Sequence, residues 1–564
     1  MPPLHSRQRC SGAGSRCFCL PSSCSPPSLF SRTAAVAFPP AAHSAARLPS
    51  SRHITRAAKT SQEPPMSQTD VAVVGTGPNG LAAAATLARA GLRIDLYEAK
   101  ESIGGGLRTE SLFDTDVVHD ICAAVHPMAA ASRFFREFDL SARGVELLQP
   151  EISYAHPLDG RRAALAFHDL DATCEHLGPD GARWRAMMEP LIRHSTGVVD
   201  LFLSGQRSIP RDLLAPLLLA PWVLAHGSPL APRLFRTEQA RSLLTGVAAH
   251  AVGRLPSLAS GAVALLLGHL AHGTGWPIPQ GGSARIAQTL ADDITAHGGK
   301  IHTGQRITDL KQLGHAKTVL LDTSPKGFVQ IAGDRLPSRY TRSLARFRYG
   351  PAAAKADFLV TDPIPWSDPE VAKAGTVHLG GTQREMFLQE TLTSKGVATT
   401  EPFVLVVDSM ATDPGRGLPG KRPVWAYAHV PNGDTRDPLE IVRARIERYA
   451  PGFTDTVIAQ RGITASAYES YNPNYVGGDI GSGALTLTQS ILRPIPQIDP
   501  YRTPLPGVYL CSASTPPGPS VHGMSGYLAA LSALRHEYGI RTSPSLSPRS
   551  PASRPFSDKT EPAL

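Results

Sequence analysis

The sequence feature that most constrains the fold is a strand, a glycine-rich turn, a helix and a second strand in immediate succession. Residues 71–74 form a continuous apolar run, which is typical of a strand buried on both faces. Residues 75–80 follow with the pattern Gly-x-Gly-x-x-Gly, and the Ala- and Leu-rich residues 81–90 predict a helix. Residues 93–97 predict a second strand, which ends at Glu98. This β-α-β order predicts an α/β fold with a parallel, Rossmann-like sheet.

Each glycine of the turn has a physical task in a dinucleotide site. Gly75 permits the tight turn, Gly77 lets the backbone approach a pyrophosphate, and Gly80 lets the helix pack closely on the strand. The N-terminus of the helix then faces the phosphates with the positive end of the helix dipole, and Pro78 and Asn79 lie in the turn before it. We therefore expect these five residues to bind the cofactor.

The residues after the second strand indicate which dinucleotide binds. Glu98 is placed to accept hydrogen bonds from both ribose hydroxyls, and its charge repels the 2′-phosphate of NADP. Three glycines and then Arg108 and Thr109 follow it. This order resembles the FAD-binding start of the flavin amine oxidase and carotenoid desaturase superfamily. The resemblance implies that FAD is the cofactor and that Gly105, Gly106 and Arg108 contact it.

Three later blocks are similar to other parts of the FAD domain in that superfamily. Residues 275–310 resemble the block that returns the chain to this domain, which implies that backbone near Ile307 contacts the adenine. Residues 318–325 predict another strand of its sheet. Residues 505–526 resemble the C-terminal flavin motif, although a serine replaces its commoner first glycine. By this resemblance a helix opens beneath the flavin, and the contacts come from Ser512, Ser514, Gly523 and Met524.

Shorter segments narrow the resemblance to the phytoene dehydrogenase-like FAD-dependent oxidoreductases. They are residues 355–357, 363–366, 376–381, 429–433 and 472–479. The resemblance implies an enzyme that dehydrogenates or desaturates a hydrophobic or amine-like small molecule by hydride transfer to the flavin N5 atom, with oxygen or a quinone as electron acceptor. The alternative is an FAD-binding regulatory protein that binds a protein partner and turns over little.

The FAD-binding domain is discontinuous on this interpretation. We expect it to comprise residues 66–150, 275–334 and 500–540. An inserted α+β substrate domain, made of residues 151–274 and 335–499, then covers the flavin. Residues 541–564 are rich in Ser and Pro and predict a disordered tail.

Residues 1–65 carry most of the net charge of +9 and have the composition of an organelle transit peptide. Eight of the 56 Lys and Arg residues lie there, together with one acid, Glu63. Two alternatives stay open. A transit peptide implies the mitochondrial matrix or another organelle, and an untranslated segment ahead of a start at Met66 implies the cytoplasm. The near balance of charges beyond Met66 argues against a basic groove for nucleic acid.

Two further patterns limit the class of protein. Beyond the leader the cysteines are Cys122, Cys174 and Cys511, whose wide spacing predicts isolated thiols rather than a disulfide framework or a metal site. Residues 213–224 are strongly apolar but too short and too proline-rich to span a bilayer. Peripheral contact with a membrane surface and a buried helix pair beside the substrate both stay open for this segment.

Three polar residues near the expected flavin contacts are candidates for catalysis. His126 follows the glycine and arginine segment and His522 precedes the expected flavin helix, so either is a candidate general base or electrostatic partner. For both, the alternative is a structurally hydrogen-bonded histidine. Lys355 is a weaker candidate, for holding a water molecule at the flavin. A base is not required where the substrate cation loses its own proton.

Overall fold

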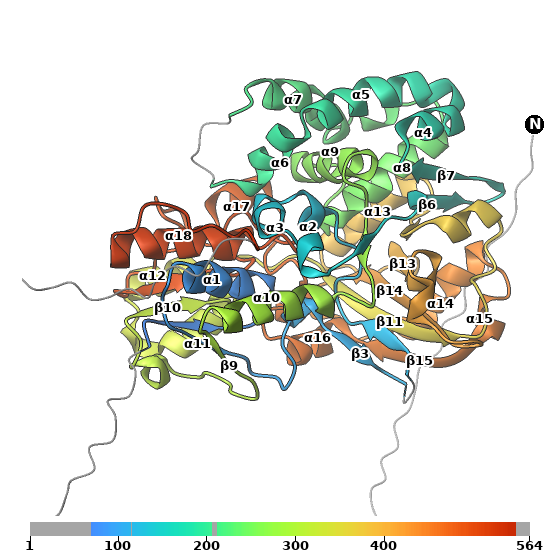
Figure 1. The fold of residues 1–564 in the computed structure, drawn as a ribbon. Coiled ribbons are helices and arrows are strands. Elements are labelled where there is room, and N and C mark those ends of the chain that lie inside the picture. The colour runs from blue at the N-terminus through green and yellow to red at the C-terminus, as the bar shows by residue number, and fades with distance from the viewer. Residues whose placement is uncertain (1–68, 114–115, 206–210, 549–564) are drawn as a thin grey trace, which may run out of the picture. The chain divides into compact units, whose positions relative to one another are not determined.

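The computed structural model describes residues 69–113, 116–205 and 211–548, all within one compact unit (Figure 1). The leader lies outside the described residues. One of the two main sheets has five parallel strands, as the glycine-turn pattern predicts. In spatial order these strands are β16 (Val508–Leu510), β10 (Thr318–Leu321), β1 (Val71–Val74), β2 (Ile94–Tyr97) and β9 (Lys300–His302).

The parallel sheet is built around β1, whose four residues are all buried because strands and helices cover it on every side. Helices α1 (Pro78–Arg89), α10 (Ala284–Ala296) and α18 (Met524–Tyr538) lie side by side over it, with α1 packed against both others (Figure 1). Helix α1 begins three residues earlier than the sequence predicts, since Pro78 is suited to the first helical position. The predicted α/β, Rossmann-like fold class is confirmed.

The second main sheet has seven strands and is antiparallel except where β6 meets β12. In spatial order its strands are β15 (Val457–Ile463), β11 (Ala352–Val360), β14 (Arg422–Val430), β13 (Val404–Asp408), β12 (Val377–Leu379), β6 (Ile152–Leu158) and β7 (Arg161–Phe167). Six helices between β7 and the return to the first sheet form a layer of their own (Figure 1). They are α4 (Leu170–His176), α5 (Gly181–Arg193), α6 (Ser195–Leu203), α7 (Leu214–His226), α8 (Glu238–Ala248) and α9 (Leu258–His272).

The remaining elements connect the two sheets or cover their outer faces. The short strands are β3 (Thr109–Ser111), β4 (Val118–Asp120), β5 (Leu147–Leu148) and β8 (Ile278–Pro279). The remaining α-helices are α2 (Pro127–Ala131), α3 (Arg133–Phe138), α11 (Pro325–Ala332), α12 (Ser338–Leu344), α13 (Gln383–Ser394), α14 (Pro438–Tyr449), α15 (Phe453–Thr456), α16 (Ala465–Tyr471) and α17 (Leu487–Leu492).

The chain passes between the two main sheets several times. Residues 71–97, 300–321 and 508–510 supply the parallel sheet, and residues 152–167 and 352–463 supply the antiparallel one. Such alternation is what a discontinuous nucleotide domain with an inserted second domain requires. The expected domain boundaries themselves stay a prediction.

The apolar segment 213–224 is partly exposed to solvent. It forms most of α7, and four of its leucines (Leu213, Leu214, Leu217 and Leu224) are between 55% and 69% exposed. Among the described residues no helix is both long and apolar enough to cross a membrane. The exposed leucines favour the membrane-surface alternative, which stays a prediction.

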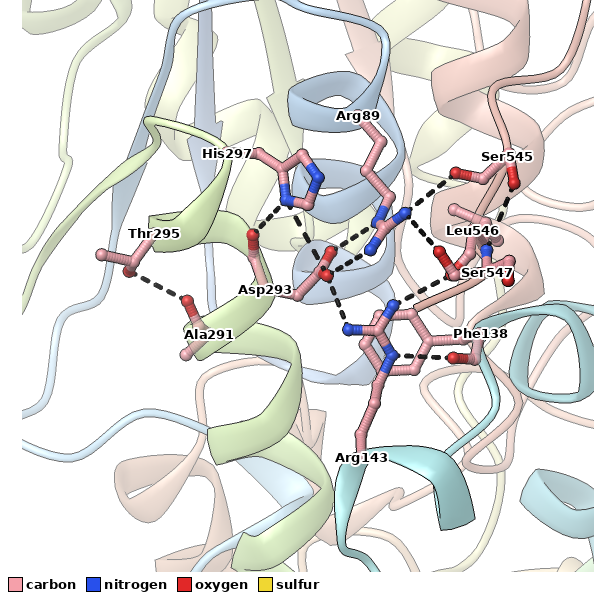
Figure 2. Close-up of polar contacts among 10 residues, drawn as sticks. All are labelled: Arg89, Phe138, Arg143, Ala291, Asp293, Thr295, His297, Ser545, Leu546 and Ser547. Carbon is pink, nitrogen blue, oxygen red and sulfur yellow. Dashed lines mark hydrogen bonds and ion pairs between the residues drawn. The ribbon is translucent and has the colours of Figure 1, made fainter. Parts of the chain in front are cut away.

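The end of the described chain departs from the expected disorder of residues 541–564. Residues 541–548 are described, and Leu546 is buried. Arg89 donates to the carbonyl oxygens of Ser545 and Ser547, and Arg143 donates to that of Leu546 (Figure 2). The prediction was wrong for these eight residues, because the guanidinium groups of Arg89, which is buried, and Arg143 hold the backbone by hydrogen bonds that no apolar pattern indicates.

One carboxylate holds both of these arginines. Asp293 accepts two hydrogen bonds from Arg89, at 2.6 and 2.8 Å, and one from Arg143 at 2.7 Å (Figure 2). Asp293 and Arg89 are almost completely buried, on α10 and α1. Asp293 therefore ties α1, α10 and the end of the described chain together through charge-assisted hydrogen bonds.

We expect Asp293→Asn to lower the free energy of unfolding by about 3–5 kcal/mol, since it removes the charge that pairs with the buried guanidinium group of Arg89 and with that of Arg143. The matched control is Glu137→Gln, which breaks the exposed pair between Glu137 and Arg133 and is expected to cost less than about 1 kcal/mol. Denaturant unfolding of both variants measures the difference. Equal, small losses would show that the cluster contributes no more than a surface pair.

Candidate functional site

The glycine loop between β1 and α1 is as tight as the sequence predicts. Gly75 has a φ of +99°, which disfavours any residue with a side chain. A Cβ atom on Gly80 would lie 2.0 Å from the carbonyl oxygen of Gly75, so the helix packs on the strand with no room for one. Gly77 faces the Asp322 carboxylate, which a Cβ atom would approach to 2.7 Å. The loop therefore presents bare backbone to the space in front of α1.

Glu98 lies at the carboxyl end of β2, beside this loop, and is nearly buried. One carboxylate oxygen accepts hydrogen bonds from the backbone N–H and the hydroxyl of Thr76. The other accepts from the backbone N–H of Lys100 and pairs with Arg108 at 3.1 Å. These contacts fix the carboxylate next to the glycine loop, the position expected for a group that binds the ribose.

A cavity of about 680 Å³ begins at the loop and extends to the antiparallel sheet. This volume is in the range of cofactor and ligand sites. Among the residues that line it are nine of the expected cofactor contacts: Gly75, Gly77, Pro78, Asn79, Glu98, Gly105, Gly106, Arg108 and Ile307. The structure thus brings three separate segments of the sequence to one site.

The C-terminal segment reaches this cavity through different residues from those expected. Ser512 and Ser514 donate hydrogen bonds to the carbonyls of Thr323 and Ser482, so their hydroxyls join neighbouring segments. The residues of this segment that line the cavity are Ala513, Pro519, Ser520 and Val521. Gly523 and Met524 lie just behind them, where α18 begins.

The lining of the cavity fits FAD. The start of α1 faces one end with its free N–H groups, and the buried amide oxygen of Asn79 has no partner among the described residues. Glu98 supplies acceptors beside this end, and Ile307 lies in the wall. Gly105, which packs against Gly77, Gly106 and the C-terminal residues named above also line the cavity and leave backbone without large side chains for a flat ring system.

The three candidate catalytic residues do not line this cavity. His522 donates from Nε2 to the Gly518 carbonyl at 3.1 Å, and its Nδ1 accepts from the backbone N–H of Met524 at 3.0 Å. His126 contacts the Ser283 hydroxyl through Nε2 at 2.8 Å. Burial lowers the pKa of each histidine to about 4, so both are neutral near pH 7. Their catalytic roles stay a prediction, and the two backbone bonds of His522 favour the structural alternative.

The ammonium group of Lys355 is paired with a neighbouring carboxylate. It forms a fully buried ion pair with Asp357, two residues along β11, and lies 5.3 Å from the centre of the Trp425 ring. Burial lowers the pKa of Lys355, and the charge of Asp357 opposes that shift. Its expected role in holding a water molecule stays a prediction.

Sequence reasoning missed Asp322, which follows β10 and lines the cavity. Its Oδ2 atom accepts a hydrogen bond from the backbone N–H of Gly80 at 3.0 Å. Burial raises its pKa to about 7. The sequence could have indicated Asp322, because it follows a predicted strand of the parallel sheet. The residues that follow such strands lie together at one edge of the sheet.

Three tyrosines that the sequence did not single out also line the cavity, close to Gly106 and Arg108. Tyr468 donates to the Ile121 carbonyl and contacts the sulfur of Cys122 at 3.2 Å. The hydroxyl of Tyr475 lies 2.6 Å from where a Cβ atom of Gly106 would be. Tyr471 packs under the guanidinium of Arg108. No sequence pattern predicts these contacts of the tyrosines, because more than 340 residues separate the two sides of each contact.

Comparison with known proteins agrees with this geometry. Residues 79–335 match the model of the flavin containing amine oxidoreductase family. Pyridine nucleotide-disulfide oxidoreductase domain-containing protein 2 of Rattus norvegicus is 23% identical over 82% of this chain and 92% of its own length. Phytoene dehydrogenase of Streptomyces griseus is 26% identical, over 77% of this chain and 87% of its own.

Solved structures share the fold. Cyclohexylamine oxidase from Brevibacterium oxydans has a TM-score of 0.52 at 15% identity, over 84% of this chain and all of its own. A putrescine oxidase has a TM-score of 0.51 at 16% identity, over 84% and 99%. At such identities the likeness shows the fold alone. Taken with the family match over residues 79–335 and the cavity, the findings support an FAD-dependent oxidoreductase that is similar to the flavin containing amine oxidoreductases and to phytoene dehydrogenase.

Proposed function

We propose that the protein dehydrogenates or desaturates a largely apolar small molecule bound in the cavity between the two sheets. The observation that carries this proposal is the continuity of one cavity from the glycine loop to an apolar wall. That wall includes Val263, Leu266 and Leu267 of α9 and Leu405 and Val407 of β13. FAD, when bound, supplies a hydride acceptor at N5, and the protein supplies position and exclusion of water.

We propose that FAD is bound as the resemblance of this chain to the flavin amine oxidase and carotenoid desaturase superfamily implies. The β1–α1 loop takes the pyrophosphate, Glu98 takes the ribose, and the backbone near Ile307 takes the adenine. Gly105, Gly106 and Arg108 contact the remainder from one side, and residues 513–524 do so from the other. The burial of Glu98 and the bare backbone of Gly77 support this arrangement.

The charges of the cavity favour a neutral substrate over a cationic amine. Its lining carboxylates are Glu98, Asp322 and Asp479. The first two lie at the glycine loop, and Asp479 accepts hydrogen bonds from three backbone N–H groups, those of Gly350, Gly481 and Gly483. None is therefore placed to pair with an ammonium group at the apolar wall. A binding protein with little turnover is the alternative function.

The site assignment predicts that Gly77→Val removes FAD, because its side chain fills the space of the pyrophosphate. Glu98→Ala is expected to weaken FAD binding by about 1–3 kcal/mol through lost hydrogen bonds to the ribose. The matched control is Glu101→Ala, one turn further on and exposed. Flavin absorbance per chain and the melting temperature of each purified variant are measured. Full flavin occupancy in both Gly77→Val and Glu98→Ala would contradict the assignment.

The proposed reaction predicts loss of the oxidised flavin absorbance when the holoenzyme meets its substrate without oxygen. In a metabolite panel we expect apolar, neutral compounds to bleach the flavin and short diamines to leave it oxidised. Reoxidation of the bleached enzyme by oxygen or by a quinone then identifies the acceptor class. Failure of every compound, together with slow reoxidation after dithionite reduction, would favour the binding-protein alternative.

The two roles of His522 predict different results for His522→Ala. A structural histidine lowers the melting temperature and leaves the rate of flavin reduction per bound FAD nearly unchanged, which is the result we expect from its two backbone bonds. A general base slows that rate by about 10²–10⁴-fold. Stopped-flow reduction by a compound from the panel distinguishes them, with each variant normalised to bound flavin.

A further inference from the structure

The floor of the cavity is one face of the antiparallel sheet, and its register places defined side chains in a row. His378 of β12 is in register with Leu405 of β13, which is in register with Tyr427 of β14. Directly paired residues of antiparallel strands present their side chains on the same face, and His378 and Tyr427 are two strand spacings, about 10 Å, apart. Leu405 and Tyr427 line the cavity itself.

A second histidine, His250, lies between His378 and the cavity. It belongs to the 3-10 turn Ala249–Ala251 after α8 and lines the cavity, and its Nε2 lies 3.0 Å from the Nε2 of His378. Burial lowers the pKa of His250 to about 3 and that of His378 far below its ordinary value, so both rings are neutral. One of the two Nε2 atoms must therefore donate and the other accept.

The surroundings of His378 decide which one donates. Its Nδ1 is buried and has no partner among the described residues. A proton there would be a buried N–H without an acceptor, a situation rarer in proteins than a bare acceptor atom. His378 therefore carries its proton on Nε2 and donates it to His250. The proton of His250 is then on Nδ1, which has no hydrogen-bond partner among the described residues and is free to donate to a ligand.

Tyr427 supplies a second neutral hydrogen-bond donor. Its hydroxyl forms no hydrogen bond with any described residue, and burial raises its pKa, so it keeps its proton. The neighbouring charged side chains have partners, since Lys355 is bound to Asp357 and Glu390 contacts His429 Nδ1 at 2.9 Å. The floor thus offers neutral hydrogen-bond donors in an apolar surface and no free charge.

We infer that the substrate carries an uncharged carbonyl or hydroxyl oxygen on an otherwise apolar skeleton, and that His250, with Tyr427 as a second donor, binds this oxygen. The inference rests on the proposed function, because it takes this cavity as the substrate site. It assigns His250 a role in substrate specificity and His378 the role of positioning it. An oxygen at the floor also fixes which carbon atoms of the substrate lie toward the glycine loop.

The test measures binding of three probes of equal length, 2-nonanone, 2-nonanol and nonane, to the holoenzyme. Fluorescence of Trp276 and Trp425, which both line the cavity, reports binding without any turnover. We expect His250→Leu to weaken ketone and alcohol binding about tenfold and to leave nonane within about twofold. Tyr427→Phe, which keeps the shape of the ring, is expected to weaken the two oxygen probes several-fold. The matched control, Leu405→Val, trims the same floor and should affect all three probes equally.

An equal effect of His250→Leu on all three probes would overturn the inference, as would wild-type protein that binds nonane alone. An effect on the alcohol but not on the ketone would also overturn it, since His250 would then be an acceptor. Flavin content and melting temperature show which variants are folded. If His250→Leu is not folded, unchanged ketone binding in Tyr427→Phe overturns the inference. Flavin bleaching by substrates that lack oxygen, at the same rate in Tyr427→Phe, would leave the proposed function standing and remove only this inference.

Discussion

The close packing of α1 between β1 and α18 is the constraint on which the rest of the structure depends. A Cβ atom on Gly80 would meet the Gly75 carbonyl at 2.0 Å, and one on Gly526 would meet the Asn79 carbonyl at 1.8 Å. Since neither position tolerates a side chain, the starts of two long helices come together at one end of the cavity. Their dipoles then favour negative charge there, which is the electrostatic requirement of a dinucleotide site.

The same geometry brings carboxylates close to the expected phosphates, which needs a physical explanation. Glu98 is compensated by Arg108 and by the N–H groups of Thr76 and Lys100. Asp322 has one backbone donor, and burial raises its pKa to about 7. A proton on Asp322 removes its repulsion of a phosphate and gives it a hydrogen-bond donor. The site thus tolerates two acidic side chains beside an anionic ligand by pairing one and allowing the other to be neutral.

The parts of the molecule that could be predicted from sequence are those in which residues close in sequence build the feature. The strand at 71–74, the glycine turn and Glu98 lie within 28 residues, so a local pattern specified them. The contact of Tyr475 with Gly106 and the row from His378 to Tyr427 depend on sheet register between distant segments, which no local pattern encodes. Residues 541–548 show the same limit, because hydrogen bonds from two distant arginines, and not their own composition, hold them.

The histidines show why position next to a motif is a weak guide to chemistry. His522 lies two residues before α18, yet both of its ring nitrogens form hydrogen bonds with backbone groups. His126 follows the glycine segment, and its remaining nitrogen is buried away from the cavity lining. His250 belongs to no motif, but it lines the cavity, and only one of its ring nitrogens has a hydrogen-bond partner among the described residues. A histidine acts on a ligand only through a ring nitrogen that has no hydrogen-bond partner within the protein. The hydrogen-bond partners of each ring therefore select the candidates, and the distance of a histidine from a motif along the chain does not.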